Sequence, residues 1–195
     1  PSTRCQKDLA RILAAELRLL VLDDFEMDDH GYVYATLPGI QAEGLPTLGL
    51  IAHVDTSPDA PGDGVHPVLH RNYQGGVLPL PGDTSVTLDP ARQPSLRAHL
   101  GHDLLSSDVT TLLGSDDKAG VAVIMQVVAD FLNADLLHEH GGEGPRPPVR
   151  VLFTVDEEVG RGVEQLDLTR FGAAVAYPVD GGAVGGIYAE TFNAA

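Results

Sequence analysis

The chain has 195 residues, of which 43% are hydrophobic and 21% charged, with a formal net charge of −16. This composition is ordinary for a globular protein and argues against a disordered chain, and no apolar run reaches the ~18 residues that a membrane span needs. The negative charge opposes binding to nucleic acid or to an anionic membrane. The single cysteine, Cys5, excludes an intramolecular disulfide framework and fits a reducing compartment.

The first part of the chain predicts a helix followed by two strands. Residues 31–37 alternate between apolar and polar positions, as a strand does. Residues 47–52 form a short apolar run, which is typical of a strand covered on both faces. Before them, apolar residues at helical spacing predict an amphipathic helix, with Leu9, Ile12, Leu13, Leu17, Leu20 and, at its end, Leu22 on its apolar face.

The middle of the chain predicts little regular structure. From about residue 66 to residue 102 the sequence is interrupted by Pro and Gly, so we expect only short strands and loops. Residues 109–113 predict a short strand or hairpin arm. The histidines of this region lack the regular spacing of metal ligands and are interpreted as surface or core residues; they are His66, His70, His99 and His102.

One strong helix is predicted in the second half of the chain. Asp116 and Asp117 open it, and carboxylates are favoured at a helix start, so either could simply be a cap. Gly120 is unfavourable inside a helix and indicates that another backbone passes close to the first turn. The apolar face keeps a three-four spacing through Val121, Ile124, Met125, Val128 and Leu132.

Further strands are predicted at residues 149–155, 173–177 and 185–195. The loop expected at residues 133–148 contains His138 and His140, a pair that can bind metal but that is not favoured in so flexible a segment. Strands separated by helical stretches predict an α/β fold, with a three-layer arrangement of a mixed, mostly parallel sheet and helices on both faces. In such sheets, ligands bind beyond the carboxyl ends of the strands.

Side chains that could bind a metal ion or transfer a proton follow three of these predicted strands. His53 and Asp55 come directly after residues 47–52 and, being two apart in an extended segment, should point the same way. A carboxylate beside a metal-binding imidazole fixes its tautomer. Asp180 follows residues 173–177 in the same manner. Taken alone, each of these could be a solvated loop residue.

Three consecutive carboxylates, Asp156, Glu157 and Glu158, follow the strand predicted at residues 149–155. A solvated acidic turn is the simplest interpretation of this run by itself. An α/β topology could, however, gather it on one sheet edge with His53, Asp116 and Asp180. Together these residues supply one imidazole and several carboxylates, the ligand set for one divalent metal or for two that share a bridging carboxylate.

Four segments of the sequence resemble a known family. GLIAHVDTSPD, TLLGSDDKAG, FTVDEEVG and VDGG are similar, in order and spacing, to the dinuclear zinc peptidase family of peptidase T, the tripeptide aminopeptidases. The likeness runs from PSTRCQ to FNAA. Wider relatives, including carboxypeptidases, dipeptidases and aminoacylases, share the metal site but lack the HVDTSPD motif. The resemblance implies a cytoplasmic enzyme that releases the first residue of tripeptides by attack of a metal-bridging water.

The resemblance also implies a ligand set for two zinc ions. His53 and Asp180 would hold one zinc, Asp116 would bridge, and Glu158 would bind the second zinc. Cobalt or manganese could substitute, because carboxylate-rich sites accept them.

Glu157 would be the general base in this scheme, and Asp55 would tune the site from beside His53. Asp117 and Asp156 match the family's motifs, but a helix start and an exposed turn explain them better.

Family members are considerably longer than this chain. They insert a lid domain after the FNAA strand, through which they form homodimers, and a late His completes the second zinc site. Residues 1–195 are therefore expected to be the amino-terminal portion of the catalytic domain, inactive or very weak alone, with a small peptide as the partner of the complete enzyme. The alternatives are another member of the wider family, a non-catalytic homologue that kept the fold, and a plain acidic scaffold.

Overall fold

The computed structural model describes residues 1–20, 24–138, 144–181 and 186–187. The chain divides into two compact units, Pro1–Asp55 with Asp116–Ala195, and Thr56–Ser115. All six residues predicted to do chemistry belong to the first unit. The assignment of residues 1–195 to a single catalytic domain stays a prediction.

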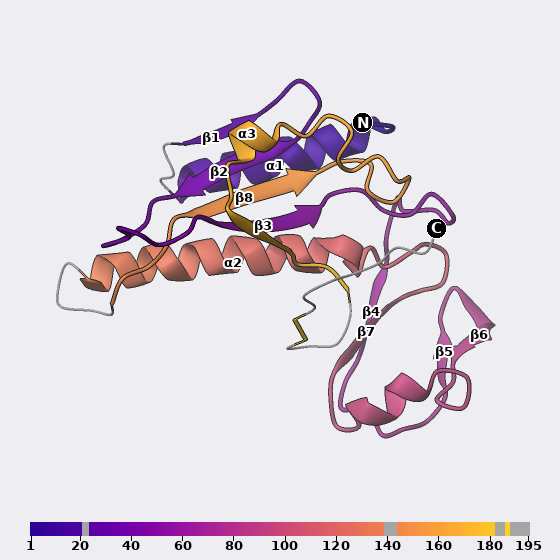
Figure 1. Cartoon of the computed structure of the whole chain (residues 1–195). Coiled ribbons are helices and arrows are strands. Elements are labelled where there is room, and N and C mark those ends of the chain that lie inside the picture. The colour runs from indigo at the N-terminus through magenta and orange to yellow at the C-terminus, as the bar shows by residue number, and fades with distance from the viewer. Residues whose placement is uncertain (21–23, 139–143, 182–185, 188–195) are drawn as a thin grey trace. The chain divides into compact units, whose positions relative to one another are not determined.

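The first unit is organised around a five-stranded sheet (Figure 1). β3 runs parallel to both of its neighbours, β8 and β9, whereas β1 with β2 and β2 with β8 are antiparallel. The sheet is therefore mixed, as predicted, and the shared direction of three strands brings their carboxyl ends to one edge. The strands lie in the order β1 (Phe25–Met27), β2 (Val33–Leu37), β8 (Val149–Thr154), β3 (Leu48–His53) and β9 (Val175–Pro178).

Helices lie on both faces of this sheet, which confirms the α/β prediction. In Figure 1, α1 (Arg4–Leu19) passes behind β2 and β8, whereas α3 (Leu168–Phe171) lies in front of them. α2 (Ser115–His138) lies beside α1, and residues of both helices line one groove. Val121, Ile124 and Val128 of α2 are buried in the same core as the β8 side chains. Among the described residues, no helix combines the length and apolar character needed to cross a membrane.

The predicted amphipathic helix is confirmed as α1, with one difference on its apolar face. Ile12 is 54% exposed, and Ala10 is buried instead. Ala10, Leu13 and Leu17 recur every three or four residues, and Ile12 falls to the side of that line. The predicted position of Leu22 lies outside the described residues.

Three predictions in this part of the fold are wrong: the end of α2, the burial of β9 and a strand at residues 109–113. α2 continues to His138 rather than ending near residue 132, because no Gly or Pro interrupts the helical sequence before the run that begins at residue 141. β9 is exposed along its length, not buried, because it lies at the edge of the sheet and pairs only with β3 among the described strands. Residues 109–113 form no strand. His140 and nearly all of residues 185–195 lie outside the described part.

The second unit, Thr56–Ser115, consists of short strands and loops, as its Pro- and Gly-rich sequence predicts. β4 (Pro67–His70) pairs with β7 (Leu104–Ser107), and β5 (Leu78–Leu80) pairs with β6 (Asp83–Leu88). A short 3-10 helix, η1 (Pro94–His99), precedes β7. His66, His99 and His102 are exposed, whereas His70 is half-buried and lies 2.9 Å from Ser106 Oγ.

Gly120 confirms the prediction that another backbone passes close to the start of α2. A Cβ at this position would lie 1.9 Å from the carbonyl oxygen of Val179, the residue before Asp180. The Val179 backbone is fixed in turn by its N–H, which donates to Ile51 O of β3 at 2.8 Å. The absence of a side chain at Gly120 thus lets the segment after β9 lie directly against the helix that carries Asp116.

Asp156 contradicts the prediction of an exposed turn, because it is buried. Its carboxylate accepts hydrogen bonds from Ser2 N at 2.7 Å and from Gln6 Nε2 at 2.8 Å, and its own N–H donates to Gln6 Oε1 at 2.9 Å. Its φ of 58° is left-handed, a conformation that Asp tolerates better than most residues. These contacts tie the start of α1 to the end of β8 and so fix the backbone that leads into Glu157.

We predict that Gly120→Ala destabilises the protein, although Ala is the better helix former by about 1 kcal/mol. The added methyl group would overlap the Val179 carbonyl, and such overpacking costs about 1–3 kcal/mol. Chemical denaturation of the full-length protein measures the change. Val123→Ala, at an exposed position of the same helix, is the matched control and should stay within about 0.5 kcal/mol of wild type. A Gly120→Ala protein that is more stable than wild type would contradict the close approach.

We predict that Asp156→Asn lowers the free energy of unfolding by about 1–3 kcal/mol, because hydrogen bonds to a charged group are lost. Burial alone would raise the pKa of Asp156, but the hydrogen bonds from Ser2 and Gln6 outweigh it and lower the pKa. The stabilisation is therefore complete above the ordinary carboxyl pKa of about 4 and is lost as the pH falls through the lowered value. Denaturation curves of both proteins from about pH 7 down to about pH 3 test this; a difference that does not shrink in acid contradicts it.

Candidate metal centre

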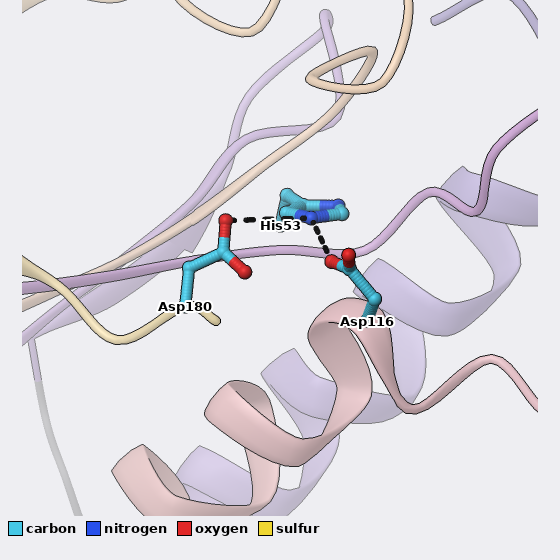
Figure 2. Close-up of side chains that lie close together, drawn as sticks. All are labelled: His53, Asp116 and Asp180. Carbon is cyan, nitrogen blue, oxygen red and sulfur yellow. Dashed lines mark hydrogen bonds and ion pairs between the residues drawn. The ribbon is translucent and has the colours of Figure 1, made fainter. Parts of the chain in front are cut away.

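The candidate centre lies where β3, β8 and β9 end beside the first turn of α2. His53 is the last residue of β3, Asp116 lies in the first turn of α2, and Asp180 follows β9 by two residues. Figure 2 shows the imidazole between the two carboxylates, which approach it from different elements. Residues separated by more than sixty positions in the chain are thus brought to one point by the parallel part of the sheet.

Three side chains offer ligand atoms close together. His53 Nε2 lies 2.9 Å from Asp116 Oδ1 and 3.9 Å from Asp180 Oδ2. One ligand atom from each of the three residues lies within 4.8 Å of the other two. The imidazole is buried, whereas both carboxylates reach solvent. The buried imidazole therefore lies on the protein side of the site, and the two exposed carboxylates lie on the solvent side, from which an ion or a substrate could enter.

Asp55 connects His53 to the segment after β8. Its Oδ1 lies 3.2 Å from His53 Nδ1. The same carboxylate accepts hydrogen bonds from the backbone N–H groups of Glu157, at 3.1 Å, and of Glu158, at 2.9 Å. The sequence spacing predicted only that His53 and Asp55 point the same way; the structure places Asp55 beside Nδ1, the ring nitrogen that does not face Asp116. Asp55 also positions the two glutamates through their backbone.

The two glutamates are placed differently. Glu157 Oε2 lies 3.7 Å from His53 Nε2, and its side chain is half exposed. The Glu158 carboxylate is not part of the described cluster whose ligand atoms lie within 4.8 Å of one another. The structure thus brings together the side chains of His53, Asp55, Asp116, Asp180 and Glu157. Glu158 is linked to this group by the hydrogen bond from its backbone N–H to Asp55.

Sequence reasoning missed two residues that hold this centre together. Asp117 is buried and does cap Gly120 N, as a helix-start residue would, but it also accepts a hydrogen bond from His53 N at 3.1 Å. Lys118 Nζ donates to the carbonyl oxygens of Asp55, at 2.9 Å, and of Asp116, at 3.2 Å. The sequence did contain one indication of the role of Asp117: GSDDKAG has two consecutive carboxylates, whereas a helix cap requires only one.

Curated relatives match the whole chain. Peptidase T of Bacillus pumilus is 43% identical and peptidase T of an Exiguobacterium species is 46% identical, each over all 195 residues. The chain is therefore similar to peptidase T along its whole length. It spans 46% of the length of each of these relatives. No protein-family model matches the chain.

A solved structure shares the fold of this chain. Aminoacylhistidine dipeptidase from Vibrio alginolyticus superimposes with a TM-score of 0.51 at 18% identity, over 89% of this chain and 29% of the other. At this identity the likeness shows the fold alone. It agrees with the α/β architecture that the sequence predicts.

The charges of the centre suit a cation. Burial by itself lowers the pKa of His53, but Asp55, Asp116 and Glu157 outweigh it and raise the pKa to about 9. Burial also raises the pKa of Glu157; His53 opposes this rise, and Asp180, Asp55 and Glu158 reinforce it. The carboxylates around the single imidazole thus raise the pKa of His53 against its burial, and they add to the effect of burial on the pKa of Glu157.

The donor set fits a divalent metal of the zinc type. One imidazole nitrogen and carboxylate oxygens are ligands that zinc accepts. The second nitrogen of His53 faces a carboxylate, which is the usual arrangement behind a metal-binding imidazole. A cation among these side chains would also balance their surplus of negative charge.

Proposed function

We propose that this chain carries the catalytic centre of a metal-dependent aminopeptidase that releases the N-terminal residue of tripeptides. The observation that carries the proposal is the convergence of His53, Asp116 and Asp180, with Glu157 3.7 Å from the imidazole. The likeness to peptidase T along the whole chain supports the substrate class. Because the relatives extend well beyond the matched length, the activity is assigned to the full-length protein.

The proposed ligands divide between two zinc ions. His53 and Asp180 hold one, Asp116 is shared, and Glu158 belongs to the second, with cobalt or manganese as possible substitutes. When bound, such metals polarise a substrate carbonyl and lower the pKa of a water molecule. The chain's own contribution is to hold the donors at the sheet edge, with Asp55 facing Nδ1 of the His53 ring.

Glu157 is the proposed general base. Its carboxylate takes a proton from the attacking water and delivers it to the amine nitrogen as the peptide bond breaks. Burial, together with the neighbouring carboxylates, raises its pKa, which moves it toward the range in which a base works efficiently near neutral pH. The hydrogen bond from Glu157 N to Asp55 Oδ1 fixes its backbone beside the imidazole.

The partners of the complete enzyme are also proposals. A small peptide is the substrate, a lid region outside this chain grips it and forms a homodimer, and the protein works in the cytoplasm. A late His, from the part of the catalytic domain that follows the lid, is the proposed final ligand of the second zinc. Nucleic acid and membranes are not proposed partners, because the chain's net charge of −16 opposes binding to both.

We predict that the full-length protein cleaves free tripeptides and carboxyl-blocked tripeptides but not amino-blocked ones. An aminopeptidase must recognise a free amino terminus, whereas a carboxypeptidase or an aminoacylase would not require it. Product analysis of the three substrates by mass spectrometry measures the preference. Cleavage of the amino-blocked peptide with no action on the free one would overturn the aminopeptidase assignment in favour of another member of the wider family.

We predict that Glu157→Gln in the full-length protein lowers kcat by about 10²–10⁴-fold, the usual contribution of a general base. The substitution keeps the shape of the side chain, so zinc content measured by elemental analysis should stay at the wild-type level. Glu43→Gln is the matched control and should keep full activity, because Glu43 is exposed and precedes the start of β3, whereas His53 ends that strand. Turnover that survives Glu157→Gln within a few-fold would show that this residue is not the base.

A further inference from the structure

We propose that Asp117 is a positioning residue for the metal centre, in addition to being a helix cap. This inference rests on the proposed function, since it concerns the geometry of the same ligands. Asp117 is not among the three side chains that offer ligand atoms to a shared point. Its role is to fix the backbone of His53 relative to the first turn of α2.

Both oxygens of the Asp117 carboxylate are used, and they serve different elements. Oδ1 accepts from Gly120 N at 3.1 Å, which caps the first turn of α2. Oδ2 accepts from His53 N at 3.1 Å, which lies at the end of β3. The side chain therefore links the residue after the Asp116 ligand to the backbone of the His53 ligand, across more than sixty positions of sequence.

The burial of Asp117 argues against a cap alone. A helix cap functions at the protein surface, where one exposed oxygen suffices. Asp117 is instead only 2% exposed, and burying a carboxylate is costly unless it is fully hydrogen-bonded. The second bond, to His53 N, offsets part of that cost.

The same turn also fixes the third ligand. Gly120, which donates to Asp117, has no side chain and lies against the carbonyl oxygen of Val179. Asp180 follows immediately in the sequence. The Asp117–Gly120 turn thus contacts the backbone beside each of the three ligands, and a change in Asp117 should alter their spacing.

The test uses the full-length protein with Asp117→Asn, which keeps the shape but replaces one acceptor oxygen by a donor. We expect its zinc affinity, measured by calorimetry, to fall by about 10–100-fold, as for other residues that orient metal ligands. Asp156→Asn is the matched control, because Asp156 is an equally buried carboxylate whose side chain bonds Ser2 and Gln6 instead. The control should lose stability but keep zinc affinity within about threefold of wild type.

A second readout needs no metal. In the metal-free protein, hydrogen exchange at the His53 amide should be faster in Asp117→Asn by about tenfold or more, because a single acceptor oxygen must then serve both His53 N and Gly120 N. Asp117→Ser, whose hydroxyl can still cap Gly120 but cannot reach His53, should show the same acceleration with a smaller loss of stability.

The outcomes separate this inference from the proposed function. Unchanged zinc affinity in both Asp117 variants, or an equal loss in Asp156→Asn, would overturn the positioning role while leaving the metal centre intact. Wild-type protein that binds no zinc would overturn the proposed function. Unchanged exchange at the His53 amide in the Asp117 variants would overturn the present inference independently.

Discussion

The crowding of carboxylates around one buried imidazole is the constraint on which the rest of the structure depends. Asp55 and Asp116 lie within 3.2 Å of the two ring nitrogens of His53, and Glu157 and Asp180 lie just beyond. Such a concentration of like charge is unfavourable unless a cation balances it. The carboxylates favour the charged form of His53, whose pKa they raise to about 9, and with burial they raise the pKa of Glu157. These residues lie together despite the cost of this like charge because the parallel strands β3, β8 and β9 end at the same edge of the sheet.

The backbone around the centre is fixed by contacts that involve no proposed metal bond. Asp55 accepts from the two glutamate N–H groups, Asp117 accepts from His53 N, and Lys118 donates to the carbonyl oxygens of Asp55 and Asp116. All of these contacts except the one from Lys118 to Asp116, which lies within α2, join two different segments at the sheet edge. Donors held in this way lose little freedom when a ligand binds, which is the physical meaning of a pre-organised site.

Much of the fold followed from local patterns, and the exceptions have physical causes. Apolar runs predicted β3 and β8, and the three-four spacing predicted α1 and α2, because periodicity reports which face is buried. The burial of β9 was predicted wrongly, since an apolar run does not reveal whether its strand is central or at an edge. The burial of Asp156 was missed because its partners, Ser2 and Gln6, are about 150 positions away in the sequence.

The most direct test of the account is the position of zinc in crystals of the full-length protein, located by anomalous scattering at the zinc absorption edge. The account predicts a peak at about 2.0–2.2 Å from His53 Nε2 and from a carboxylate oxygen of Asp180, the usual zinc bond lengths. A peak elsewhere on the protein, or none at this edge of the sheet under zinc-saturating conditions, would contradict it.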